Sequence, residues 1–271
     1  MSDIVLSPGV RSNLLQLQQT SDLITQTQTR LATGKKVNSA LDNPINFFTA
    51  QGLSVRANDL NSLLDAMSNG INTIQAANNG ISAITKLVQS MQALTSQAQQ
   101  TADTTVRATL ASQFDTLLTQ IDQLAADSGF NGINLLGGND LTITMNSDAT
   151  SNVVVSAFND TTAGDLAINA SQNSWAGTAD ITAASDNLKT ALTTLRSQAQ
   201  SLSSNLSTVQ IRQDFTKSMV NTLQSGADSL TLADSNEEGA SLLALQTRQQ
   251  LSTTALSLAS QADQNVLRLF Q

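Results

Sequence analysis

The chain has 271 residues with 13 Lys and Arg against 21 Asp and Glu, a formal net charge of −8, and only 3% aromatic residues. This acidic balance, with no basic run longer than Lys35-Lys36, argues against a nucleic-acid partner, because phosphate contacts need clustered basic side chains. Cys and His are absent, which removes thiolate chemistry, imidazole bases and the commonest zinc ligands, so we expect no enzyme, no cofactor and no metal site.

The first predicted helix spans about residues 8 to 33. Ser7 and Pro8 form a helix-start signal, since the hydroxyl caps free N–H groups and Pro lacks one, while Gly34 suits the other end. Apolar residues recur at spacings of three and four when two polar residues fill the gaps, as in a coiled-coil seam. They are Val10, Leu14, Leu17, Ile24 and Leu31.

A second helix is predicted from about residue 44 to 98, after the start signal Asn43-Pro44. Its apolar residues recur every seven positions at Leu60, Met67, Ile74, Ile81 and Val88. The pairs Asn69-Gly70 and Asn79-Gly80 ordinarily indicate turns, and each Gly costs roughly 1 kcal/mol inside a helix. A turn would reset the apolar phase, and the phase does not change. We therefore expect one helix whose glycines let neighbouring helices approach closely.

A third helix is predicted over about residues 104 to 127. Its apolar stripe consists of Val106, Leu110, Phe114, Leu117, Ile121 and Leu124. From Phe130 to about Ala170 the period changes to two: Asn131-Gly132 is a hairpin signal, and apolar residues alternate with polar ones around Ile143. We expect a small β insert of about forty residues.

Helical spacing then returns in two further helices. The longer one carries Leu188, Leu192, Leu195, Ala199, Leu202, Leu206, Val209, Val220, Leu223, Ala227 and Leu230. The last one follows Asp234-Ser235-Asn236-Glu237, which has the spacing of a capping box. Its stripe is Leu251, Ala255, Leu258, Ala262, Val266 and Leu269.

Two polar motifs have a chemical and a structural interpretation. Gly34-Lys35-Lys36 faintly resembles a phosphate-binding loop, but the rest of that motif is missing and a helix C-terminus is favoured. Asp234, Glu237 and Glu238 fit either a divalent cation or the N-terminus of a helix, and the second is favoured. No apolar run is long enough to span a membrane, and the N-terminus lacks the features of a cleavable signal.

The apolar seams of the first and last helices are the feature that needs a partner. They consist of Leu and Ala with uncharged polar residues around them, so little charge opposes dense association. These seams fit pairing with each other within a subunit or with other subunits. The predicted polymerisation seam consists of Leu14, Leu17, Ile24, Leu31, Leu251, Leu258, Val266 and Leu269.

The sequence resembles bacterial flagellins at several places in their order along the chain. Residues 30–43, RLATGKKVNSALDN, are similar to the flagellin stretch RLSSGLRINSAKDD, and residues 130–136, FNGINLL, resemble the hairpin signature FNGxxLL. Ala233-Asp234 with Glu237-Glu238 resembles the ADYATE region, and residues 264–270, QNVLRLF, are similar to the terminal QNVLSLL. The likeness covers roughly residues 1–136 and 178–271, and it omits the outer domains of larger flagellins.

This resemblance implies a mainly α fold: a long antiparallel helical coiled-coil rod, a terminal two-helix coiled coil and a small central β insert. It implies an N-terminal inner-tube helix and spoke (1–43), N-terminal rod helices (44–136), an outward-facing insert (137–177), a C-terminal rod helix (178–235) and a C-terminal inner-tube helix (236–271). The implied protein is a secreted subunit of the extracellular flagellar filament, which polymerises with itself for swimming motility.

The resemblance also implies partners: an export chaperone, the type III export apparatus, the filament cap and the hook-filament junction proteins. Residues 88–98 correspond to the flagellin patch for Toll-like receptor 5, LQRVRELSVQA, but Ser90 and Gln92 replace its arginines and Ala93 its Glu, so we expect weak or absent recognition. Two alternatives stay open: a hook-filament junction protein, and an enzyme or ligand-binding protein on a helical scaffold.

Overall fold

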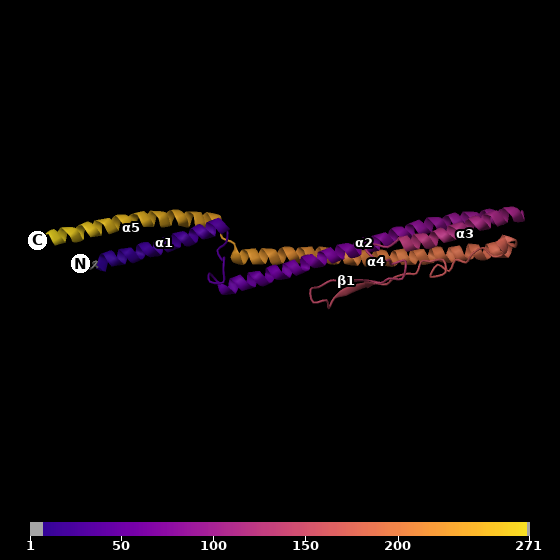
Figure 1. Ribbon diagram of the computed structural model, residues 1–271, viewed down its shortest axis with the longest axis horizontal. Helices are drawn as coiled ribbons and strands as arrows, with labels where there is room; N and C mark the ends of the chain where they lie inside the picture. Colours follow the sequence, from indigo (N-terminus) through magenta and orange to yellow (C-terminus); the bar gives the residue numbers. More distant parts are fainter. Residues whose placement is uncertain (1–7, 270–271) are drawn as a thin grey trace. The chain divides into compact units, whose positions relative to one another are not determined.

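The structure is a computed structural model that describes residues 8–269, except the side chains of residues 263 and 266–269. Five α-helices carry most of the described chain: α1 (Pro8–Thr33), α2 (Pro44–Gln100), α3 (Thr104–Asp127), α4 (Thr178–Thr231) and α5 (Ser235–Leu269). Between α3 and α4 lie the strands β1 (Leu141–Thr144) and β2 (Asn152–Val155) and the one-turn 3-10 helix η1 (Asn173–Trp175) (Figure 1). The predicted fold class, mainly α with a small β insert, is confirmed.

The chain divides into two compact units. The terminal unit comprises residues 1–55 and 222–271 and contains α1, α5, the start of α2 and the end of α4. The central unit comprises residues 56–221 and contains α3, the insert and the remaining parts of α2 and α4. The finer division into inner tube, rod and insert stays a prediction.

The helix boundaries follow the capping signals of the sequence. Asn43 Oδ1 accepts a hydrogen bond from the backbone N–H of Asn46 at 3.0 Å and starts α2. Asp234 Oδ1 accepts one from the backbone N–H of Asn236 at 2.8 Å and starts α5. Gly34, just beyond α1, has a φ of +67°, a conformation that suits Gly because it has no Cβ. The predicted ends of these helices are confirmed.

α2 runs without a break through both Asn-Gly pairs. A Cβ atom at Gly70 would overlap the side chain of Ile143 in β1, and one at Gly80 would overlap Ser128 and Leu136 beyond α3. The glycines therefore do permit close approach. Their partners are the insert and the segment after α3 rather than long neighbouring helices, because the chain folds back along α2 after α3 ends.

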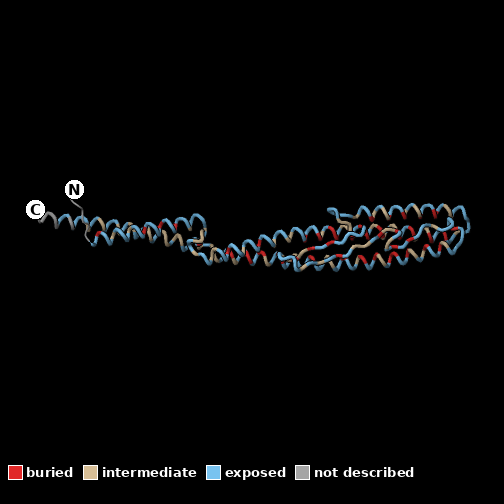
Figure 2. The backbone as a smooth tube through the Cα atoms, turned by 60° about the horizontal axis from the view of Figure 1, so that its bottom comes forward, coloured by how far each residue is buried: buried red, intermediate tan, exposed pale blue. Residues whose placement is uncertain are grey.

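The core of the central unit lies among α2, α3, α4 and the insert (Figure 2). The stripe predicted for α2 is buried from Met67 to Val88, and the stripe predicted for α4 is buried at Leu188, Leu195 and Leu202. Between Val209 and Val220 the stripe of α4 is polar: Thr216 is buried and Gln213 is half-buried. Gln213 Nε2 donates a hydrogen bond to Ser68 Oγ of α2 at 2.8 Å, so a polar pair replaces an apolar one.

α3 buries a stripe that differs in part from the predicted one. Leu110, Phe114 and Ile121 are buried as expected. Leu118 is buried, whereas Leu117 lies at the edge of the core and Val106 is exposed. The reason is that α3 packs against α2 on one side and against the insert on another, which rotates its inner face away from a single narrow stripe.

The β insert follows the predicted alternation. β1 pairs antiparallel with β2, with Leu141 opposite Val155 and Thr144 opposite Asn152. Leu141, Ile143, Met145 and Val155 are buried, and Val154 is exposed. Before the strands, Phe130 and Ile133 exchange two backbone hydrogen bonds of 2.9 and 3.0 Å around Asn131-Gly132, both at positive φ, as in a type I′ turn.

Two aspartates on α3, seven residues apart, hold the segment that follows the strands. Asp115 accepts hydrogen bonds from the backbone N–H of Ser171 at 2.8 Å and from its hydroxyl at 2.7 Å. Asp122 accepts the same pair from Thr162, at 2.7 and 3.0 Å. Because a carboxylate accepts charge-assisted hydrogen bonds, each aspartate fixes both the backbone and the side chain of one loop residue.

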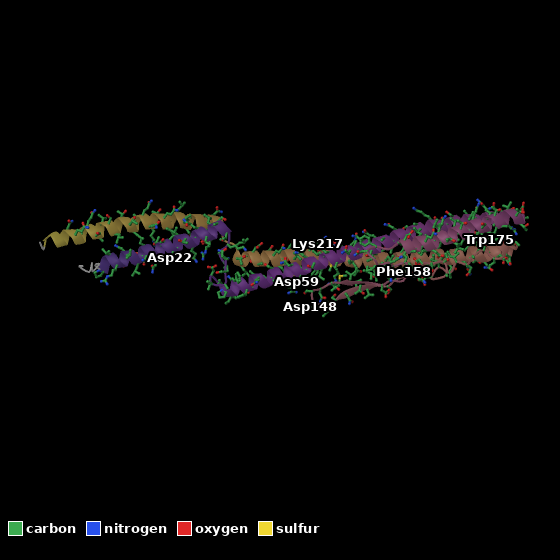
Figure 3. The ribbon with its side chains drawn as sticks, viewed as in Figure 1. Asp22, Asp59, Asp148, Phe158, Trp175 and Lys217 are labelled. Atoms are coloured by element: carbon green, nitrogen blue, oxygen red, sulfur yellow. The ribbon has the colours of Figure 1, made fainter. Side chains whose placement is uncertain are left out.

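The insert ends in a left-handed turn. Asn173, Ser174 and Trp175 have φ values of 48°, 49° and 55°, a run that costs energy because each Cβ approaches the following carbonyl. The turn carries the indole of Trp175, labelled in Figure 3, into the core. There its ring meets that of Phe114 edge to face at a centroid distance of 5.1 Å. Burial of this large ring offsets the backbone strain.

Candidate assembly surface

α1 and α5 pack against each other in the terminal unit (Figure 1). The face of α1 that is covered combines Val10 and Ile24 with Thr20 and Thr27, all buried. Val10, Leu17 and Ile24 lie seven residues apart, and so do Thr20 and Thr27, which is the heptad pattern of a coiled coil. Half of the contact on α1 is therefore polar.

Buried Thr20 has a hydrogen-bond partner within its own helix. The hydroxyl of Thr20 donates to the backbone carbonyl of Gln16, four residues earlier in α1, at 2.8 Å. A Thr that bonds within its own helix is buried without an unmet donor, and it presents its methyl group to the neighbouring helix. Alternating threes and fours from Leu14 to Leu31 would put Ser21 and Gln28 in this seam, but both are exposed, since the heptad runs through Thr20 and Thr27 instead.

α5 has two apolar stripes rather than one. Leu242, Leu245, Leu256 and Ala259 are half-buried and follow the heptad spacing of the side that meets α1. The second stripe is exposed, with Leu251 at 67% and Leu258 at 62% of their full accessible area. Ala255 and Ala262 continue the exposed stripe. A helix with apolar residues on two sides normally has neighbours on both.

The predicted seam residues therefore divide into two groups. Ile24 is buried and Leu17 half-buried in the contact between α1 and α5. Leu14, Leu31, Leu251 and Leu258 are exposed in the single chain. The side chains of Val266 and Leu269 lie outside the described residues. The seam thus mixes positions of an intramolecular pair with positions that have no cover in the described chain.

Backbone and charged contacts fix the helix pair where α1 ends and α5 begins. The backbone N–H of Lys36 donates to the carbonyl of Thr231 at 2.7 Å, which ties the end of α1 to the end of α4. Arg30 Nη1 and Glu238 Oε1 form an ion pair at 3.2 Å between α1 and α5. Beside this pair lies an open groove lined by Leu23, Leu245 and Arg248, among others. It offers one more partly apolar surface for a neighbour.

The polar motifs of this region have structural roles. Asp234 caps α5, and Glu238 pairs with Arg30, which agrees with the interpretation of these acids as a helix N-terminus. Lys36 Nζ donates to the carbonyl of Ser229 at 3.2 Å, and Gly34 ends α1, which agrees with the helix-end interpretation. Within the described residues, no three acidic, His or Cys side chains gather into a metal-binding group. Over the same part of the chain, no helix combines the length and apolar character needed to cross a membrane.

The chain is similar to known flagellins over its whole length. Residues 10–140 match the family described as the bacterial flagellin N-terminal helical region. Flagellin FljM of Caulobacter vibrioides is 31% identical over 274 residues, covering 100% of this chain and 99% of that protein. A flagellin of Brucella melitensis is 25% identical over 282 residues, covering 100% of both chains. The solved structure of Bacillus cereus flagellin has a TM-score of 0.47 and 18% identity over 57% of this chain and 88% of that one.

The described chain is thus built of long paired helices, with an exposed Leu-Ala stripe on α5. The full-length likeness to FljM goes further, and the chain belongs to the bacterial flagellin family, the subunits of the flagellar filament. The hook-filament junction alternative receives no support, because the relatives named above are flagellins.

Proposed function

We propose that this chain polymerises into a flagellar filament that drives swimming, and that the exposed stripe of α5 is one of its subunit contacts. The observation that carries this proposal is the exposure of Leu251 and Leu258 on a helix whose opposite side already meets α1. Contacts between different surfaces of identical subunits generate an open helix when the rotation between neighbours does not close into a ring.

The physical driving force is burial of the uncovered apolar area. Each fully buried Leu contributes about 1.5–3 kcal/mol, so two leucines at nearly two-thirds exposure supply on the order of 2–4 kcal/mol per subunit when a neighbour covers them. Leu14 and Leu31 of α1 add to this. Every subunit makes such contacts with several neighbours, and a contribution of this size then separates a filament from a dispersed monomer.

Replacement of the two leucines tests this contact. The variant Leu251→Asn with Leu258→Asn should raise the critical concentration for polymerisation in kosmotropic salt by at least about 10-fold, because 1.4 kcal/mol equals one factor of ten. Gln250→Asn with Ser257→Asn is the matched control: both residues are exposed on α5, lie seven residues apart and receive the same side chain. Sedimentation of filaments measures both. Equal critical concentrations for the two variants would show that the stripe is not a subunit contact.

The further parts of the proposal follow from the family resemblance. We propose that the subunit is exported through the flagellar type III apparatus with a chaperone, adds beneath the filament cap and continues from the junction proteins to an extracellular filament. We also propose that it has no enzymatic activity and no membrane or nucleic-acid partner. A strain lacking this chain, in which the other flagellins are deleted too, should not swim, and plasmid expression of the chain should restore motility.

We also propose that Toll-like receptor 5 recognises this flagellin weakly. Ser90 and Ala93 are exposed on α2, where the recognised flagellins carry charged residues. The adjoining surface hollow between α2 and α3 is lined by Ser90, Leu94, Gln113, Thr116 and Leu117, with no charged side chain. Strong activation of a receptor-reporter cell line at low dose would contradict this part of the proposal.

A further inference from the structure

The core of the central unit contains a carboxyl group without a hydrogen-bond partner. Asp160, in the segment after β2, has an exposed fraction of 0%. Neither of its carboxyl oxygens receives a hydrogen bond from the described residues, and the same holds for the amide oxygen Oε1 of Gln198 on α4. The Gln198 side chain is buried and lies next to the carboxyl group. These three buried acceptor atoms therefore lack a hydrogen bond of good geometry, which is costly, although the amide N–H group of Gln198 lies beside the carboxyl group.

The surrounding charges make a carboxylate ion still less favourable. Asp165, in the same segment, repels a negative charge at Asp160. Asp122 of α3 is also acidic and binds Thr162, two residues away. Arg196, the basic residue of α4 nearest to Gln198 in sequence, is exposed. Over the described residues, no basic side chain forms an ion pair with Asp160.

A single proton resolves this arrangement. A neutral carboxylic acid has one O–H donor and one carbonyl acceptor, and a primary amide has the matching N–H donor and carbonyl acceptor. We propose that Asp160 is a proton-binding site: the folded central unit holds it as the neutral acid, paired with the Gln198 amide, so that the contact between the insert and α4 depends on pH. Ionisation removes the O–H donor and leaves a buried negative charge whose neighbouring donor is the amide N–H group of Gln198.

The direction of the dependence follows from the titration. Burial raises the pKa of the Asp160 carboxyl from 3.8 to about 6; the Gln198 side chain opposes this shift and the charge of Asp165 adds to it. Because the folded state binds the proton more tightly than the unfolded state, the contribution to stability is complete below pH 3.8 and is lost as pH rises through about 6. The group therefore changes its charge near pH 6.

Carboxyl 13C NMR of the full-length monomer tests the proposal directly. One aspartate should titrate with a midpoint near pH 6, and its signal should be absent from Asp160→Asn. In Asp165→Asn the same signal should titrate at lower pH, because the repulsion that raises the pKa is removed while the Asp160 site remains. An Asp160 carboxyl that is fully ionised at pH 5 in the folded wild-type chain would overturn the proposal.

Thermal unfolding, followed by the fluorescence of the single Trp175, provides a second readout. At pH 8 the Asp160→Asn variant should unfold roughly 5 °C above the wild type, and below pH 5 the difference should shrink toward zero. A neutral amide at position 160 can pair with Gln198 at any pH. A cation is the competing occupant: if 5 mM CaCl2, at constant ionic strength, stabilises the wild type at pH 8 but not the variant, the site holds a metal ion and the proton proposal is wrong.

Discussion

Glycine has opposite consequences at two positions of the same helix. Gly52 and Gly80 both lie inside α2, where Gly is less favourable than Ala by roughly 0.8–1 kcal/mol. Around Gly52 a Cβ atom would have no neighbour within 4 Å. Around Gly80 a Cβ atom would overlap Ser128 and Leu136. The Cβ of Ser128 is bonded directly to the backbone, so it cannot rotate away as the end of a flexible side chain can. The effect of a larger residue on stability is therefore set by helix propensity at Gly52 and by packing at Gly80.

We predict opposite signs for the two alanine variants. Gly52→Ala should stabilise the chain by about 0.5–1 kcal/mol, through propensity alone. Gly80→Ala should destabilise the central unit by about 1–2 kcal/mol, since overpacking costs more than the helix gains. Chemical denaturation followed by Trp175 fluorescence and by circular dichroism measures both. A stabilising Gly80→Ala would show that the segment around Leu136 does not pack on α2 as described.

The ionised carboxylate of Asp42 holds the loop between α1 and α2 by hydrogen bonds, so the stability of this loop depends on pH at acid pH. Its Oδ2 accepts hydrogen bonds from the backbone N–H groups of Ser39 and Asn38, both at 2.9 Å. These bonds lower the pKa of the Asp42 carboxyl below 3.8, and the bond from Ser39 has the larger effect. The sign is opposite to that at Asp160: the contribution of Asp42 is present above pH 3.8 and is lost as pH falls through its lowered pKa.

NMR titration of backbone amides checks this second pH effect. The amide signals of Ser39 and Asn38 should move together with a midpoint below pH 3.8, and they should not titrate in Asp42→Asn. Asp22, exposed in the middle of α1, provides a control substitution, since Asp22→Asn should leave both signals unchanged. A midpoint at or above 3.8 would mean that the loop bonds do not favour the ionised form.

Among the elements, the long helices are the part that the sequence predicts best. α2 keeps one apolar phase over its whole length, so its heptad positions and its start at Pro44 follow from pattern and capping, and its predicted end near residue 98 lies close to the observed end at Gln100. The left-handed turn at Asn173–Trp175 had no such signal. Its conformation depends on the burial of Trp175 against Phe114, a contact between residues far apart in the chain that periodicity does not encode.

The faces of α1 and α5 show where pattern analysis stops. The Leu-Ala stripe of α5 was found, but it is the exposed side, whereas the side that meets α1 runs through Leu245 and Leu256. A helix with two apolar stripes gives no internal clue about which one its own chain covers. On α1, burial of Thr20 and Thr27 was missed, since a polar residue that bonds within its helix looks like a surface residue in sequence.

The two aspartates of α3 are predicted to anchor the insert. The double variant Asp115→Ala with Asp122→Ala removes the acceptors of four hydrogen bonds and leaves partly buried donors on Ser171 and Thr162 without partners, at about 1–3 kcal/mol for each site. Hydrogen exchange should accelerate at least about 10-fold in residues 157–171 and change little in α5. Gln120→Ala with Gln123→Ala, both exposed on α3, is the control. Unchanged exchange in residues 157–171 would show that apolar packing alone holds the segment.

At the scale of the whole molecule, the two units differ in how far each buries its own apolar side chains. The central unit encloses a core from α2, α3, α4 and the insert, with large side chains such as Met67, Phe114 and Trp175 buried. The terminal unit covers only one side of the α1–α5 pair and leaves Leu residues exposed on both helices. This difference is expected of a subunit that folds one part by itself and completes the other by assembly.

Because the chain has no cysteine, introduced thiols can test directly whether other subunits cover the exposed stripe of α5. Ala255→Cys places a small thiol in the exposed stripe of α5 with little change in size, and Val154→Cys places one on the exposed side of β2. The reaction of each thiol with a maleimide is then timed in dilute monomer and in filaments of the same protein. We predict rapid labelling of both in monomer, a loss of at least about 10-fold at position 255 in filaments, and no change at position 154. Equal labelling of position 255 in monomer and filament would contradict the claim that other copies cover the stripe.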